Sequence, residues 1–515
     1  MPASHKIITK LRERRQIEAY LRQMESADSE SEFEQQAQQI AALGPQVIPA
    51  IVGNLDQADA QMLAAMGTVA IFLDRDEIVT ALRQKALQPH HTDRGRLNAL
   101  TLLERFLGEV LDDDLLVGLS DPESIAVSSL RTVLAQATAN PAVLIEYIQG
   151  LDRVEPDVVL AVSRSLQAMS GEQTVEPLRM MAQDVRDEIA AEALQVLGAI
   201  RLPQAAKALQ TLLPIVTPDL RPLAERALRK LRFIGIEISE LPPPDPNWRA
   251  LASPIDGLGR QSLWFIQEVP MAAQARFLNI LISDRAGAVE AAGHAQVPTQ
   301  ILPPKRMAGH LHDIALPDGS GAMLMLEIPF DTGRYLVLDA LAANRETQIP
   351  VAGDLRLWSP WLWMASGADS LPASALPEQG PEDDALFADS DQLLQHPAFA
   401  TWTAQTEGAF RAAEQAMQQP GWKREVWLRR LAGELFADPI VSEVLSQRLA
   451  AMSEWLLLAD DEPRARMALL TAEGLSENDP LAQPFIKALI QRDLELTLHN
   501  STQEANPALG DRKTN

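Results

Sequence analysis

The chain has 515 residues, a formal net charge of −25 and no cysteine. The absence of cysteine excludes disulfides, thiolate metal sites and cysteine nucleophiles, and it fits a reducing cytoplasm, where we expect the protein to act. The acidic excess argues against nucleic acid and anionic membranes, which require clustered lysine and arginine. We expect no membrane span, because no apolar run reaches about 18 residues, and no secretory signal, because the basic start lacks an apolar core.

Residues 1–32 are predicted to form an N-terminal capping helix followed by an acidic link. Ile7 and Leu11, then Ile17 and Leu21, are each four residues apart among basic residues, as in an amphipathic helix. Such a helix can also lie on a membrane surface or dock onto a partner. We interpret it as the cap of a helical array, because terminal repeats need a polar outer face.

Paired helices are predicted throughout residues 33–236. The second helix of each pair opens at a recurring step of about 30 residues, which is typical of helical solenoids. These openings are Asp59, Asp93, Asp121, Glu155, Asp187 and Pro218. We therefore expect an α-solenoid of about six helix pairs, with a groove that binds another protein.

The clearest pair spans residues 187–212. Its first helix has apolar residues at three- and four-residue spacing, which line one helical face. Gly198 permits close approach of another helix, and Pro203 is suited to the first turn of the next helix. The stretch predicts a helix, a tight turn and a second helix.

This pair resembles HEAT repeats, in particular the short type of phycobilisome-lyase-like proteins. The resemblance rests on the runs Ala-Ala-Glu-Ala-Leu at residues 190–194 and Leu-Gly-Ala-Ile at residues 197–200. It covers roughly residues 33–234 and specifies packing rather than chemistry. The resemblance implies a solenoid with a binding surface, and some relatives are lyases or modify nucleic acids.

Four further segments follow the solenoid, and the whole protein is expected to be mainly α. A Pro-rich connector at 237–247 leads to a small α+β domain at 248–364. All nine tryptophans of the chain lie at or after Trp248. An acidic disordered linker at 365–391 precedes an all-α domain at 392–499. The polar residues after these are predicted to form a disordered tail, 500–515.

An Asp-Thr-Gly triplet at Asp331 is the first candidate for chemistry. In aspartic proteases two such aspartates share a proton and activate water. The resemblance ends with this fragment, because Arg334 follows and the sequence contains no second triplet of this kind. Since an adjacent arginine lowers the pKa of a carboxyl and opposes proton sharing, we interpret the triplet as turn residues.

The second candidate is a set of metal ligands, in which His310 and His312 are joined by a third ligand. This third ligand is either Asp313 or His294. Two histidines at i and i+2 on a strand face the same way and can bind a metal through imidazole nitrogen. The flanking prolines and glycine indicate a loop with surface histidines instead. We therefore predict no cofactor and keep His310, His312 and Asp313 as candidate ligands.

Two basic patches are candidates for nucleic-acid binding. One comprises Arg221, Arg226, Arg229, Lys230 and Arg232; the other is residues 422–430, where tryptophan and arginine alternate. Bases could stack on such tryptophans. We interpret both patches as structural, because cations complement the end of a helix and the chain as a whole is acidic.

The leading functional hypothesis is a non-enzymatic scaffold or adaptor that binds another protein in the solenoid groove. The alternative is an enzyme, or a lyase-like protein that modifies a cofactor or chromophore, with its site in residues 248–364. The sequence leaves the partner and the oligomeric state open.

Overall fold

The chain forms two compact units, Met1–Ala135 and Gln136–Asn515. The computed structural model describes residues 16–24, 30–58, 60–87, 93–109, 130–131, 133–138, 140–169, 171–269, 271–315, 321–366, 380–403, 424–475 and 482–504. As predicted, these residues are mainly helical. Within those ranges, none of the helices combines the length and the apolar character that crossing a membrane requires.

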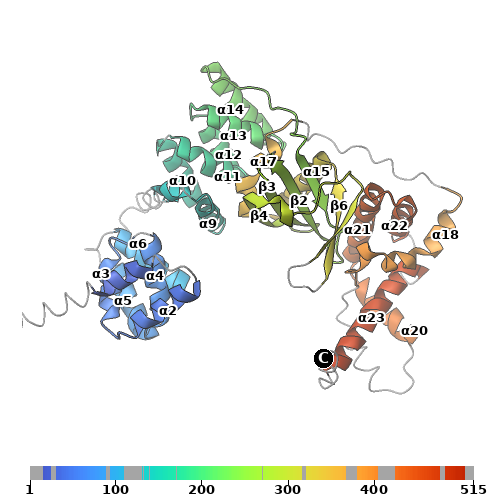
Figure 1. The fold of residues 1–515 in the computed structure, drawn as a ribbon, viewed down its shortest axis with the longest axis horizontal. Coiled ribbons are helices and arrows are strands. Elements are labelled where there is room, and N and C mark those ends of the chain that lie inside the picture. Colours follow the sequence, from blue (N-terminus) through green and yellow to red (C-terminus); the bar gives the residue numbers. More distant parts are fainter. Residues whose placement is uncertain are drawn as a thin grey trace, which may run out of the picture. The chain divides into compact units, whose positions relative to one another are not determined.

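The first unit is a bundle of short helices around one apolar core (Figure 1). Residues 16–24 are helical. The other helices are α2 (Glu30–Ala41), α3 (Val47–Asn54), α4 (Ala60–Ile71), α5 (Arg75–Leu87), α6 (Asp93–Thr101) and the π-helical turn η1 (Leu102–Phe106). Their buried apolar side chains form one cluster that extends from Ile17 to Leu107. Beside it the buried Lys85 forms an ion pair with Asp56, with a distance of 2.7 Å between Nζ and Oδ2.

The prediction of a single α-solenoid over residues 33–236 is wrong. The chain divides after Ala135, so the helices before and after that point belong to different compact units. A regular spacing of apolar residues shows that a helix buries one face, but it does not determine which other helix packs against that face. The predicted helix starts at Asp59 and Asp121 lie outside the described residues.

The second unit begins with six helices in two rows. The front row consists of α9 (Ala142–Leu151), α11 (Val175–Met181) and α13 (Pro203–Leu212), and the back row of α10 (Pro156–Met169), α12 (Asp187–Leu197) and α14 (Arg221–Phe233). A 3₁₀ turn, η2 (Glu172–Thr174), precedes α11. The predicted role of Pro203 is confirmed, since it opens α13 after the extended Leu202. Gly198 also allows a close approach: a Cβ there would lie 2.7 Å from Cβ of Ala227 on α14.

A six-stranded antiparallel sheet follows, which is larger than the small α+β domain that the sequence predicts. Its strands are β1 (Trp248–Ala252), β2 (Arg260–Val269), β3 (Gln274–Ser283), β4 (Gly287–Pro298), β5 (Leu311–Ala315) and β6 (Ala322–Ile328), with the 3₁₀ turn η3 (Thr299–Ile301) after β4. The strand order is β4-β3-β2-β1-β6-β5. The first strand is therefore central, and Leu251 faces Trp264 on one side and Glu327 on the other.

Helices cover one face of the sheet. The helix α15 (Phe330–Thr347) crosses strands β1 to β4, and Gly333 brings its first turn against Phe265 and Ala250. Two short helices follow, α16 (Gly353–Trp358) and α17 (Pro360–Trp363), and they pack against the front row (Figure 1). The other face carries an apolar cluster of Leu251, Ile266, Ala275 and Met325, with Trp264 and Phe277 partly buried beside it.

The C-terminal helices dock on the loop between β1 and β2. These elements are α18 (Asp383–Ala388), η4 (Ser390–Gln395), η5 (Pro397–Phe399), α20 (Arg424–Leu435), α21 (Pro439–Leu458), α22 (Glu462–Gly474) and α23 (Pro484–Glu504). The indole nitrogen of Trp402 donates to the carbonyl of Ile255 at 2.8 Å, and Arg448 donates to the carbonyl of Gly257 at 2.7 Å.

Two of the predicted disordered segments are partly ordered. The acidic linker predicted at 365–391 contains α18, because Asp383 is held by the guanidinium of Arg466 on α22. The tail predicted at 500–515 begins inside α23, which ends at Glu504. Charge density alone does not reveal such partners. The remaining parts of both segments, 367–379 and 505–515, lie outside the described residues.

Candidate functional site

The four candidate metal ligands do not converge. His310 and His312 lie side by side, with ring centroids 4.8 Å apart. Asp313 is exposed on the opposite side of the strand from the buried His312. His294 lies on β4, at the other edge of the sheet from β5. Across the ranges that the structure describes, no group of three His, Cys, Asp or Glu side chains could hold a metal ion.

His312 instead belongs to a buried charged cluster with Glu327 and Arg249. Its Nε2 lies 2.9 Å from Oε2 of Glu327, and Nη1 of Arg249 lies 3.1 Å from the same oxygen. All three side chains are less than a tenth exposed. Arg249 and Glu327 are residues that sequence reasoning missed, although a single charge inside an otherwise apolar strand was an available signal.

The buried cluster fastens the segment before β5 to the sheet. Arg249 also donates through Nη2 to the carbonyl of Pro303. The backbone of Glu327 bonds to the same segment, since its carbonyl accepts from the amide of Gly309 at 2.8 Å and its amide donates to the carbonyl of His310 at 2.9 Å. Because Glu327 is already engaged by two partners, the geometry favours a structural role over acid–base chemistry.

The Asp-Thr-Gly triplet lies in the first turn of α15 and is not placed as a catalytic dyad. Asp331 accepts a hydrogen bond from Arg334 at 2.9 Å. The fully buried Arg334 also stacks over Phe330 and Trp363 and donates to the carbonyl of Ala365 at 2.9 Å. Asp331 thus faces an arginine rather than the second carboxylate of an aspartic protease dyad.

Buried arginines join the front row to the sheet domain. Arg179 on α11 donates to Oγ of Ser359 and to the carbonyl of Leu357, each at 2.7 Å. A second arginine extends from the sheet domain to the front row. Arg356 on α16 contacts Asp152, the residue that follows α9, with 2.9 Å between Nη1 and Oδ1. The chain's own α16 and α17 therefore cover part of the front row, and a pocket of about 340 Å³ stays open beside them, lined by residues of α11 and α13 such as Glu176 and Lys207.

The surroundings of the contact between Arg356 and Asp152 shift the pKa of the Asp152 carboxyl. Burial raises the pKa of the Asp152 carboxyl, the guanidinium of Arg356 lowers it, and the charge of Asp184 adds to the rise. The net direction is upward. A raised pKa means that the fold opposes the charged form of Asp152 more than Arg356 favours it.

The back row carries a groove between α12 and α14, with a volume of about 360 Å³. The small residues Gly198 and Ala227 line it where the two helices are closest. Arg226 and Lys230 line the α14 side, and Glu192 contributes one acidic group. The charge of the groove is therefore basic in balance, in contrast to the chain as a whole.

Of the two predicted basic patches, the structure describes the first fully. All its cations are exposed on α14, and Arg229 alone forms an ion pair on that helix, with Glu225 at 3.6 Å. The second patch, 422–430, falls partly outside the described residues. Within its described part, Arg430 pairs with Glu434 on the surface of α20.

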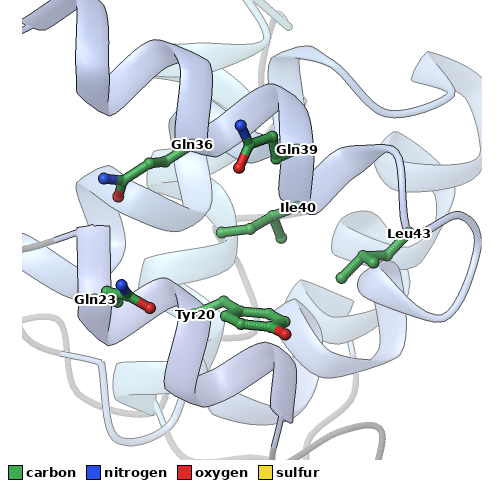
Figure 2. A pocket seen from close by; sticks show the side chains of 6 residues that line it. All are labelled: Tyr20, Gln23, Gln36, Gln39, Ile40 and Leu43. Carbon is green, nitrogen blue, oxygen red and sulfur yellow. The ribbon is translucent and has the colours of Figure 1, made fainter.

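A further cavity of about 380 Å³ lies in the first unit, between the helix 16–24 and α2 (Figure 2). It is lined by Tyr20, Gln23, Gln36, Gln39, Ile40 and Leu43. Figure 2 shows Ile40 between the three amides and the phenol, with Leu43 at one side of the group. The lining carries no charge and no nucleophile stronger than a phenol, so it offers shape and neutral hydrogen bonds rather than catalysis.

No family model, no curated protein and no solved structure matches this chain. The resemblance of residues 187–212 to HEAT repeats therefore stays a prediction. Function has to be argued from the surfaces described above.

Proposed function

We propose that this protein is a non-enzymatic adaptor that binds another protein through its back row of helices, α10, α12 and α14. One observation carries the proposal: α16 and α17 cover part of the front row and its remaining pocket is balanced in charge, whereas the back row offers an uncovered groove that is basic in balance. The groove lies between two helices that pack closely at Gly198 and Ala227, so little ordering entropy is lost on binding. The HEAT resemblance and the cysteine-free composition support an adaptor that acts in the cytoplasm.

The test is photo-crosslinking of the full-length chain in its own cells. A photoreactive amino acid replaces Gln195, an exposed residue that lines the groove. The matched control carries it at Gln296, an exposed residue on β4. We expect one protein adduct from position 195 and none of the same mass from position 296. Equal adducts at both positions, or none at position 195, would contradict the proposal.

The alternative is an enzyme or a cofactor-modifying protein with its site in the sheet domain. The observation that favours an enzyme is the contact between His312 and Glu327, which resembles a general base and the carboxylate that orients it. This reading requires that His312→Gln abolish a turnover activity while the chain stays folded. Retention of turnover by His312→Gln would exclude it.

A further inference from the structure

One side of α14 presents cations and an uncovered aromatic ring. Arg226, Arg229, Lys230 and Phe233 are at i, i+3, i+4 and i+7, which places them along one stripe of a helix. The core side of α14 is formed by other residues, Ala224, Ala227 and Leu231 among them. Phe233 is 94% exposed, so its ring contributes little to the fold.

The backbone at the C-terminal end of α14 is ordered, so the exposed ring of Phe233 has a fixed attachment point. Gly235 has φ +92°, its amide donates to the carbonyl of Arg232, and the amide of Ile236 donates to the carbonyl of Leu231. This pair of bonds is the Schellman motif, which closes a helix and requires a left-handed residue. Phe233 therefore leaves α14 from an ordered turn.

A structural explanation accounts for only part of this stripe. Cations in the last turn offset the negative end of the helix dipole, which explains Lys230 and Arg232. It does not explain Arg226 in the middle of the helix or the exposure of Phe233. Among the described residues, the side chains of Arg226 and Lys230 form no ion pair with a neighbour, so their charge is available.

We infer that the groove between α12 and α14 receives an acidic segment of a partner protein, which sets an apolar side chain against Phe233. The inference rests on the proposed adaptor function and specifies the partner's chemistry. Carboxylates would pair with Arg226 and Lys230, and the amide of Gln195 on the opposite wall can bond to a peptide backbone. An exposed aromatic residue beside cations is typical of an interface anchor.

Two other kinds of partner fit less well. Nucleic acids and anionic membranes also attract cations, and the net charge of −25 opposes every anionic partner alike, so the number of cations and the shape of the site decide between them. Protein–DNA complexes typically engage about six to ten phosphates, more than this stripe supplies. A bilayer surface is flat, whereas this site is a groove of about 360 Å³.

The test is fluorescence anisotropy with the full-length protein and a labelled peptide rich in Glu and Leu. Wild type should bind it saturably, and salt should weaken the binding because the attraction is electrostatic. The double variant Arg226→Glu/Lys230→Glu should bind at least about tenfold more weakly, and Phe233→Ser should lose several-fold. The control Arg285→Glu/Arg306→Glu makes the same charge change on exposed positions of the sheet domain and should bind within about twofold of wild type.

Each other outcome overturns the inference. Binding that does not saturate, or equal weakening of binding in the groove and control variants, would leave only nonspecific attraction. Stronger binding to phosphatidylserine vesicles or to oligothymidylate, lost in the groove variant, would reassign the stripe to lipid or nucleic acid. Self-association that the groove variant abolishes would make the occupant a second copy. A crosslinked partner at position 195 that survives Arg226→Glu/Lys230→Glu would preserve the adaptor proposal and refute this inference alone.

Discussion

The guanidinium of Arg356 lies 2.9 Å from the carboxylate of Asp152, which is 204 positions earlier in the chain. Their side chains are 1% and 9% exposed. The pair joins α16 to the turn after α9, so it ties the helical rows to the sheet domain. A buried ion pair adds little net stability against an apolar replacement, but the loss of one partner leaves an uncompensated charge.

We therefore expect Arg356→Met to lower the free energy of unfolding by about 3 kcal/mol, measured by urea denaturation at pH 7. Burial raises the pKa of Asp152 and Arg356 lowers it, so the removal of Arg356 raises this pKa further. Protonation as the pH falls through that raised pKa then stabilises the fold, so the loss should be smaller at pH 5 than at pH 8. The double variant Asp152→Leu/Arg356→Met should recover most of the loss. A double variant no more stable than the single one would contradict this account.

A second prediction concerns the cluster of Glu327, Arg249 and His312. Glu327→Gln removes the charge that both partners face, and the free energy of unfolding should fall by about 3 kcal/mol. Glu290→Gln on β4 is the matched control, because it makes the same change at an exposed carboxylate and should stay within about 0.5 kcal/mol. Urea denaturation of both variants measures the difference, and equal losses would show that the buried cluster is not the cause.

The contact between Asp383 and Arg466 predicts a dependence on pH. Hydrogen bonds from Arg466 lower the pKa of Asp383, with distances of 3.0 and 2.6 Å to its two oxygens. A carboxyl with a lowered folded pKa stabilises the fold above its unfolded value of about 4, and this contribution disappears as the pH falls through the folded pKa. Asp383→Asn should thus lower Tm at pH 7, and its deficit against wild type should shrink below about pH 4. A deficit that is constant with pH would refute the assignment.

The close approach of α12 and α14 gives a fourth prediction. Gly198→Ala places a Cβ 2.7 Å from Cβ of Ala227 and 3.1 Å from its Cα, so the helices must move apart. The free energy of unfolding should fall by about 1–3 kcal/mol. Gly150→Ala on α9 is the control, since a Cβ there meets no atom within 4 Å. That substitution should stabilise the helix by about 0.5–1 kcal/mol, and thermal unfolding should therefore give opposite signs.

Local patterns predicted part of the fold correctly. Pro203 opens α13, because the fixed φ of proline suits the first turn of a helix. The described residues are mainly helical, as the three- and four-residue spacing of apolar residues indicated. The close packing at Gly198 is a similar case, because a missing Cβ beside an amphipathic face leaves room for a neighbour.

The rest depended on contacts that no local pattern encodes. The flanking prolines and glycine predicted surface histidines in a loop, but His312 is buried on β5. Strand order puts His294 at the opposite edge and Glu327 beside His312. The approximately 30-residue helix period could not reveal that the chain divides after Ala135. The partly covered front row likewise depends on residues far along the sequence.

Arg179 reaches its acceptors only late in the synthesis of the chain. Ser359 and Leu357 follow it by 180 and 178 positions. At about 5–20 residues per second, translation supplies them roughly 10–40 s after Arg179 itself. During that interval the front row exposes the surface that α16 and α17 later cover, so the helical rows can dock on the sheet domain only after residues 353–363 have been synthesised.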